Sequence, residues 1–199
     1  MGVCINYRGK LKSPQQVFKL IEEMEDICQT MEWKYTIIQE DWTKPSDVHF
    51  VNDPITNHLK IEGDAYLKGI IFTPIKCESM QLLFDKNGTL TSLIQKAFEN
   101  SLEDYQPTYQ WTKTQFAGAD VHITLIKLLK YLQKKYMPDL DVKDEGEYWE
   151  TEDRAKLERN LGIIDAAIQL ISDIAENRDS VASFLEKLEK WLTTKENDT

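Results

Sequence analysis

The chain has 199 residues, of which 41% are hydrophobic and 29% are charged, and its formal net charge is −10 at pH 7. This balance is typical of a globular chain that can bury a core, and it argues against a disordered one. An acidic chain lacks the basic surface that nonspecific nucleic-acid binding needs, so we expect no nucleic-acid partner. No apolar run approaches the roughly 20 residues of a membrane span, and the first residues lack the apolar core of a signal peptide. We therefore expect no membrane partner.

The three cysteines are Cys4, Cys28 and Cys77, an odd number at wide spacing. None of them forms the short-spaced pair of a metal or redox motif. We therefore expect free thiols in a reducing compartment, the cytoplasm. Cys28 falls on the apolar stripe of a predicted helix and is expected to be a small core residue.

Three elements are predicted in the first forty residues. Residues 3–8 indicate a short strand. A helix is predicted to begin at Ser13, which is expected to cap it, with Pro14 in the first turn and Gln16 closing a capping box. Residues 33–40 then indicate a second strand. The apolar residues of the helix recur with the 3.6-residue period of a face on a core: Val17, Leu20, Ile21, Met24, Ile27, Cys28 and Met31.

The middle of the chain predicts strands. Residues 41–57 show no periodicity and contain two prolines, which indicates a long loop. Residues 67–73 and 80–84 are apolar runs of strand length. An Asn-Gly turn leads from the second run to residues 89–93, and residues 109–115 suggest one more strand. We expect an antiparallel meander.

The second half of the chain predicts helices. Residues 119–136 have a broad apolar stripe and end before a proline. Residues 157–171 and 181–192 carry two further stripes with helical spacing. The fold class expected from this order is α+β, an antiparallel or mixed sheet covered by helices, with a mostly helical C-terminal half.

We expect residues 1–199 to form a single domain. It would comprise a mixed α/β part over residues 1–116 and a helical part over residues 117–199, with an acidic insertion at residues 139–153.

Residues 139–153 contribute −7 of the formal charge of −10, since eight of these fifteen residues are Asp or Glu and one is Lys. Such a density of carboxylates favours a cation or a basic protein partner. We expect the segment to be ordered, with its carboxylates facing water. The candidate binding residues are Asp144, Glu145, Glu147, Tyr148, Trp149 and Glu150.

Two aromatic residues lie inside the acidic segment. Tyr148 and Trp149 either anchor it to the core, which we favour, or form the apolar centre of a contact surface. Gly146 suggests a tight turn, with a hairpin that has Val142 in one arm and the aromatic pair in the other. Thr151 is expected to cap the helix that follows.

A cation site is an alternative for the same carboxylates. The segment does not match the EF-hand calcium loop: counted from Asp139, Lys143 stands at a ligand position and Asp144 replaces the required glycine. Looser cation binding is left open.

Histidines offer a second set of metal ligands or bases. His49 and His58 lie in or beside the irregular stretch, near several aspartates, without the spacing of a known zinc motif. His122 lies in the first turn of the helix predicted over residues 119–136. We expect it to cap or bridge at the edge of the core rather than to act as a catalytic base.

No catalytic signature is present, whether nucleophile elbow, phosphate-binding loop or dinucleotide fingerprint. We expect no cofactor. The leading hypothesis is a non-enzymatic interaction or regulatory module whose acidic segment meets a basic protein. The alternatives are a metal-binding protein or metal-assisted hydrolase that combines carboxylates with histidine, and a structural module whose C-terminal helices pack against a second copy as a homo-oligomer.

Overall fold

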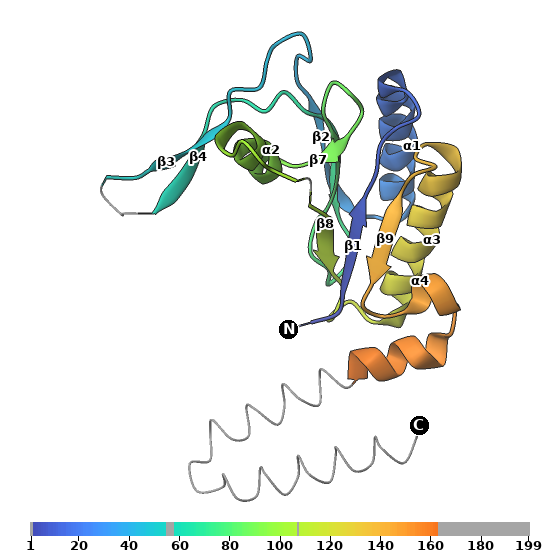
Figure 1. Ribbon diagram of the computed structural model, residues 1–199. Coiled ribbons are helices and arrows are strands. Elements are labelled where there is room, and N and C mark those ends of the chain that lie inside the picture. The colour runs from blue at the N-terminus through green and yellow to red at the C-terminus, as the bar shows by residue number, and fades with distance from the viewer. Residues whose placement is uncertain (1, 55–57, 107, 163–199) are drawn as a thin grey trace, which may run out of the picture.

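The computed structural model of the chain describes residues 2–54, 58–106 and 108–162 (Figure 1). Its strands pair antiparallel and helices cover them, which confirms the α+β class. In chain order the elements are β1 (Cys4–Arg8), the 3₁₀ helix η1 (Pro14–Gln16), α1 (Val17–Thr30), β2 (Lys34–Gln39), β3 (His49–Asn52), β4 (Leu59–Glu62), β5 (Lys68–Thr73), β6 (Met80–Phe84), β7 (Leu90–Thr91), α2 (Leu93–Ser101), β8 (Gln110–Lys113), α3 (Ala119–Lys135), β9 (Asp141–Asp144) and α4 (Tyr148–Thr151).

The strand β1 is the centre of a three-stranded sheet in the order β8-β1-β9. Ile5 is paired with Thr112 of β8 on one side and with Asp144 of β9 on the other. Side chains alternate between the faces of a strand, so Ile5 and Tyr7 point into the core, where both are fully buried. Part of the acidic segment is therefore a strand beside β1.

A four-stranded sheet in the order β2-β5-β6-β7 holds the two most apolar strands. The strands predicted over residues 67–73 and 80–84 are confirmed as β5 and β6. The helix α1 packs on this sheet through its apolar stripe, with Leu20 and Met24 fully buried. Trp33, just after the helix, stacks on Phe72 of β5 with 5.5 Å between ring centroids.

The predicted start and end of this helix need correction. Ser13 does not cap it: its hydroxyl bonds to the side chain of Gln15, and Pro14–Gln16 form η1 before α1 begins. Met31 follows the last residue of α1 and is 41% exposed, so it does not extend the buried stripe.

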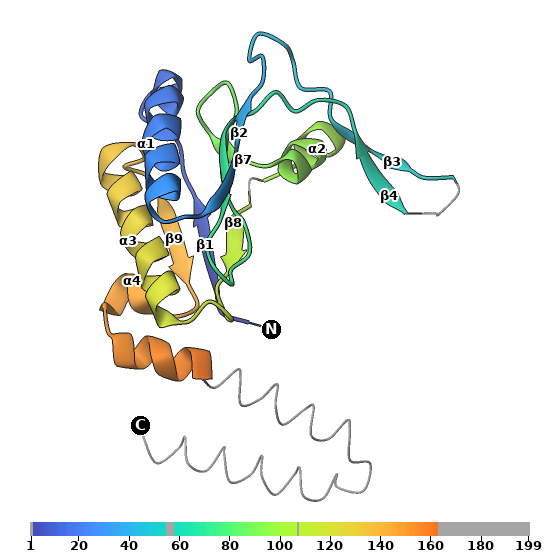
Figure 2. The same cartoon turned by 180° about the vertical axis from the view of Figure 1, so that it is seen from behind.

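The main core lies between α1, α3 and the two larger sheets. The two helices run side by side in both views, on the side of the sheets opposite to α2 (Figures 1 and 2). The stripe predicted over residues 119–136 is buried as α3. The largest fully buried side chains are Tyr7, Tyr136, Phe72, Phe84, Ile5, Leu20, Met24, Ile70, Met80, Leu82, Leu125 and Ile126.

Two elements were missed by the sequence analysis. The stretch over residues 41–57 is not a continuous loop, because β3 lies within it and pairs with β4 in a hairpin that projects from the body (Figure 1). The helix α2 begins at Leu93, where the predicted strand over residues 89–93 ends, and no element was predicted over residues 94–108. Its buried positions include Gln95 and Lys96, so the face of this helix that packs inward is not its apolar face.

Past the acidic segment, a helix occupies residues 154–162. Thr151 does not cap it, since Thr151 is the last residue of α4. The Asp153 carboxylate accepts a hydrogen bond from the Lys156 amide at 3.1 Å and caps it instead. The rest of this predicted helix and the helix predicted over residues 181–192 lie outside the described residues.

Candidate functional site

The acidic segment is built from β9, a turn and α4. The predicted hairpin around Gly146 is wrong, because β9 pairs with β1 and the chain then enters α4. Gly146 matters for a different reason. A Cβ there would lie 2.6 Å from Leu157 Cδ1 and 2.9 Å from Nε2 of His122, so any other residue would force these side chains to move.

Most carboxylates of the segment already have partners within the chain. Asp141 forms an ion pair with Arg8 at 2.9 Å and accepts a hydrogen bond from the Tyr109 hydroxyl. These contacts lower the pKa of Asp141, the Tyr109 hydrogen bond most of all. The remaining partners are the Lys10 amide for Asp139, the Cys4 amide for Glu145, Lys156 and Asn160 for Glu147, and Lys130 for Glu152.

Asp144 is buried, so the expectation that its carboxylate faces water is wrong. Its Oδ1 atom lies 3.0 Å from Nε2 of His122, and neither side chain is exposed. The same carboxylate accepts hydrogen bonds from the amides of Gly146, Tyr148 and Trp149 at 2.7, 2.7 and 2.9 Å. It thus fixes the turn and the start of α4.

Charge stabilisation outweighs burial at this carboxyl. Burial by itself raises the pKa of Asp144, but the hydrogen bond and charge of His122 and the backbone amides lower it, and the net pKa is below its usual value. The buried pair therefore holds an ionised carboxylate in the interior.

His122 connects its own helix, α3, to three other parts of the fold. Its Nδ1 atom lies 2.8 Å from the hydroxyl of Thr114, which also donates to the Val3 carbonyl at 3.2 Å. Hydroxyl, imidazole and carboxylate stand in the order of a nucleophile, base and acid. However, Thr114 and His122 are both 0% exposed, so no substrate can reach them. The arrangement ties β1, the end of β8, α3 and the turn together.

The other candidates in the segment are partly exposed. Tyr148 and Trp149 are half-buried and pack against the main core, and the Lys130 ammonium lies 5.5 Å from the Trp149 ring centre. Glu150 is exposed, and it has no ion-pair or hydrogen-bond partner among the described residues. The aromatic pair therefore anchors the segment.

The three histidines are not brought together. His49 and His58 are exposed on and beside the projecting β3–β4 hairpin, while His122 is buried in α3 across the sheets (Figure 1). In the part of the chain that the structure describes, no three His, Cys, Asp or Glu side chains are grouped so that they could hold a metal ion.

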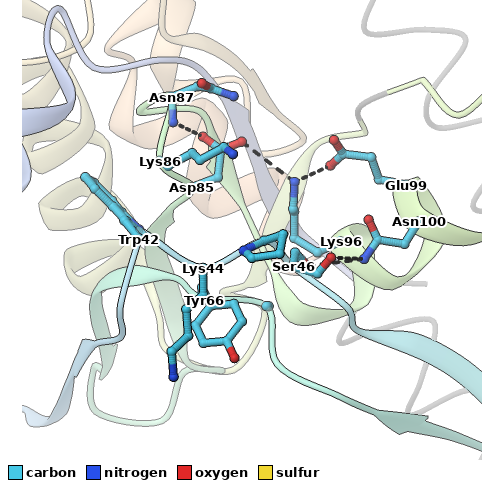
Figure 3. A pocket seen from close by; sticks show the side chains of 12 residues that line it. Trp42, Lys44, Ser46, Tyr66, Asp85, Lys86, Asn87, Lys96, Glu99 and Asn100 are labelled. Carbon is cyan, nitrogen blue, oxygen red and sulfur yellow. Dashed lines mark hydrogen bonds and ion pairs between the residues drawn. The ribbon is translucent and has the colours of Figure 1, made fainter.

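A polar pocket of about 230 Å³ lies between α2 and the loops after β2 and β6 (Figure 3). Its most buried polar side chain is Lys96, which is 10% exposed. The ammonium lies 2.7 Å from Glu99 and 3.8 Å from Asp85. Two carboxylates therefore already neutralise this cation, and the other charged residues of the lining are Lys44 and Lys86.

The first turn of the helix α2 has its polarity reversed. Gln95 and Lys96 are 8% exposed, whereas Leu93 and Ile94 are 43% and 54% exposed. The polar side chains are buried because they have partners: Gln95 bonds to the backbone and hydroxyl of Thr108 at 2.8 Å, and Lys96 joins the ion pairs described above. These bonds fix the helix with an apolar edge in solvent.

A second, larger cavity runs along that apolar edge. It is a groove of about 560 Å³ between the start of α2, the face of the β5–β6 sheet that α1 leaves open, and β8. Leu93 and Ile94 form one wall, Ile71 lies on the floor, and Trp111 of β8 forms the other wall with 59% of its surface exposed. We call this the α2–Trp111 groove.

Sequence reasoning missed the groove because its walls come from distant segments. The only local signal was a set of apolar residues four positions apart, Ile94, Phe98 and Leu102. All three are more than 40% exposed in the structure. That spacing is also the signature of a buried helix face, so the sequence alone does not reveal the exposure.

No protein-family model, curated protein or solved structure matches this chain. Within the described ranges, no helix combines the length and apolar character needed to cross a bilayer.

Proposed function

We propose that this chain is a non-enzymatic protein-interaction module that binds its partner through the α2–Trp111 groove. The observation that carries the proposal is the reversed polarity of the first turn of α2, which buries Gln95 and Lys96 and exposes Leu93 and Ile94. A clustered apolar surface of this kind is unfavourable in water and typically marks a contact site. Trp111 across the groove adds an aromatic residue of the type that dominates binding energy at interfaces.

The internal pairing of the acidic segment supports this location over the one expected from the sequence. A basic partner would have to compete with Arg8, Lys130 and Lys156 for carboxylates that these residues already bind. Exposed ion pairs contribute little net affinity. The expected role of Glu145, Glu147 and Glu150 in meeting a basic protein stays a prediction.

A capture experiment tests the proposal. Tagged full-length protein would be used to capture partners from the native host, followed by mass spectrometry, with three variants in parallel. The double variant Leu93→Ser, Ile94→Asp places a charge in the groove. Ile75→Ser is the matched control, because Ile75 is 64% exposed and does not line the groove.

We expect the wild type and Ile75→Ser to capture a partner in stoichiometric amount. The Leu93, Ile94 double variant should capture at least about tenfold less of it. A third variant, Glu147→Gln with Glu150→Gln, tests the acidic segment in the same assay. If the Glu147, Glu150 variant loses the partner and the Leu93, Ile94 variant keeps it, the acidic segment and not the groove is the contact site.

A further inference from the structure

The geometry points to strand addition as the binding mode of the α2–Trp111 groove. We propose that its occupant is an extended segment of another protein that pairs with the free edge of β8 at Trp111. Alternate apolar side chains of that segment would fill the groove, and a basic group at one end would face Glu78. This inference rests on the function proposed above and adds the chemistry of the partner.

The first observation is an unpaired backbone edge. In an antiparallel strand, the N–H and C=O of alternate residues point to opposite sides. The Thr114 amide points to β1, since it donates to the Val3 carbonyl at 2.9 Å. The Lys113 carbonyl points the other way and accepts from the Glu78 amide at 3.3 Å. By this alternation, the N–H and C=O of Trp111 also point away from β1, and they have no partner among the described residues.

The chain itself supplies the first position of a neighbouring strand. Glu78 accepts the Lys113 amide through its side chain and donates its own amide to the Lys113 carbonyl. The chain then runs away into β6, and the groove opens between β6 and β8. Glu78 forms the first hydrogen bonds along the outer edge of β8, at Lys113. An added segment would form the next ones, at Trp111.

The side chains around the groove suit an extended apolar segment. A strand presents every second side chain to one face, at a spacing of about 7 Å. One such face would meet Leu93, Ile94 and the Trp111 ring, which are all more than 40% exposed. Proteins normally protect an edge strand with charges or proline, and β8 has one charged residue, Lys113 at its end, while Trp111 is 59% exposed in the middle of the strand. Main-chain hydrogen bonds then give affinity, and the groove gives specificity.

Charge completes the description of the partner. Among the described residues that line the groove, Glu78 alone is charged. One of its oxygens accepts the Lys113 amide, which leaves the rest of the carboxylate for an incoming group. A lysine, an arginine or an amino terminus complements it.

Two other occupants fit less well. Pairing of two β8 strands about Trp111 would set Tyr109 of one copy against Lys113 of the other, whose outward groups already bind Glu78. The chain's own residues 163–199 carry apolar residues at helical spacing, and a helix would leave the Trp111 backbone unpaired.

The test begins with a random 12-residue peptide library panned on the immobilised full-length protein. The double variant Leu93→Ser, Ile94→Asp is used for subtraction. The best binder is then synthesised and its Kd is measured by fluorescence anisotropy. We expect alternating apolar residues with a Lys or Arg near one end, and weaker binding as salt rises.

Two substitutions separate the backbone of Trp111 from its ring. Trp111→Pro removes the outward N–H without touching the bonds to β1, and proline is tolerated on an edge strand. Trp111→Ala keeps the N–H and removes the ring. We expect both to weaken the peptide, by about 3- to 10-fold for the lost hydrogen bond. N-methylation along the peptide should weaken binding at every second position. Glu78→Gln should weaken binding and flatten its salt dependence.

Strand addition is overturned, with the proposed function intact, if the peptide loses affinity for the Leu93, Ile94 double variant but binds Trp111→Pro like the wild type. It is also overturned by light scattering that finds a dimer which Trp111→Pro dissociates. If panning enriches no peptide that distinguishes the wild type from the double variant, both the binding mode and the proposed function fail.

Discussion

Asp144 and His122 lie against each other in the interior, with 3.0 Å between Oδ1 and Nε2 and no solvent exposure of either side chain. The pair joins the end of β9 to the first turn of α3, and three backbone amides complete the coordination of the carboxylate. Its energetic role can be measured directly.

Replacement Asp144→Asn should cost about 1.5–3 kcal/mol of unfolding free energy, because the buried carboxylate accepts hydrogen bonds from three backbone amides and lies against Nε2 of His122. Urea denaturation measures the change. Glu150→Gln, at the exposed and unpaired carboxylate of the same segment, is the control and should stay within about 0.5 kcal/mol of the wild type. Equal stability of both variants would show that the buried pair contributes nothing net.

The same pair should make stability depend on acid. Burial raises the pKa of Asp144, but His122 and the amides lower it further, so the folded pKa lies below the unfolded value of about 3.9. A depressed carboxyl pKa adds stability above the unfolded pKa, and this is lost as pH falls through the folded pKa. The stability gap between wild type and Asp144→Asn should therefore shrink below about pH 4. A gap that is constant from neutral pH to pH 3 would contradict this.

Gly146→Ala should destabilise the fold by about 1–3 kcal/mol, since the new methyl group would overlap Leu157 and His122. Gly162→Ala is the matched control. Its methyl group would meet no atom within 4 Å, and in a helix it should be neutral or stabilising by up to about 1 kcal/mol. Thermal melts of the two variants should therefore move apart, and a shared direction would refute the packing at Gly146.

Met24→Asp should cost several kcal/mol or prevent folding, because Met24 is fully buried between α1 and the sheet and an aspartate there would have no partner. Met31→Asp tests the corrected end of the helix. Its side chain is 41% exposed, so the change should be small. The two melting temperatures give the comparison, and similar losses would place Met31 in the core after all.

Thiol labelling should rank the cysteines. Burial raises the pKa of Cys28 and of Cys77 to about 11, and it also raises the pKa of Cys4. Native protein at pH 8 should therefore react slowly, and Cys28, which is fully buried, should react last. Denatured protein without reductant should show three free thiols. A count of one would reveal a disulfide.

The parts of the fold that sequence reasoning recovered are those with a clear period. In β5, β6 and α3 the buried positions are mostly apolar, so the sequence pattern by itself predicts which residues are buried. The hairpin arm expected at Val142 is the strand β9, but its pairing with β1 was not predicted, because its other inward position is Asp144 and an aspartate is expected to face solvent. Asp144 meets His122 only through tertiary packing, and no local sequence pattern predicts this contact.

The candidate site was harder to predict than the fold. The residues 139–153 drew attention through their charge, and the structure pairs most of that charge internally. In α2, polar residues take the buried positions because Thr108, Asp85 and Glu99 bind them. The exposed apolar edge follows from those long-range contacts, and its meeting with Trp111 depends on how β8 pairs with β1.

The central place of β1 between β8 and β9 has a consequence for synthesis on the ribosome. Both neighbours of β1 belong to the second half of the chain, and the last of them ends at Asp144. At roughly 5–20 residues per second, β1 leaves the ribosome many seconds before either neighbour exists. During that interval Ile5 and Tyr7 are apolar side chains on a strand with two open edges. The interval between the synthesis of β1 and that of β9 is therefore a stage at which this strand needs protection from aggregation.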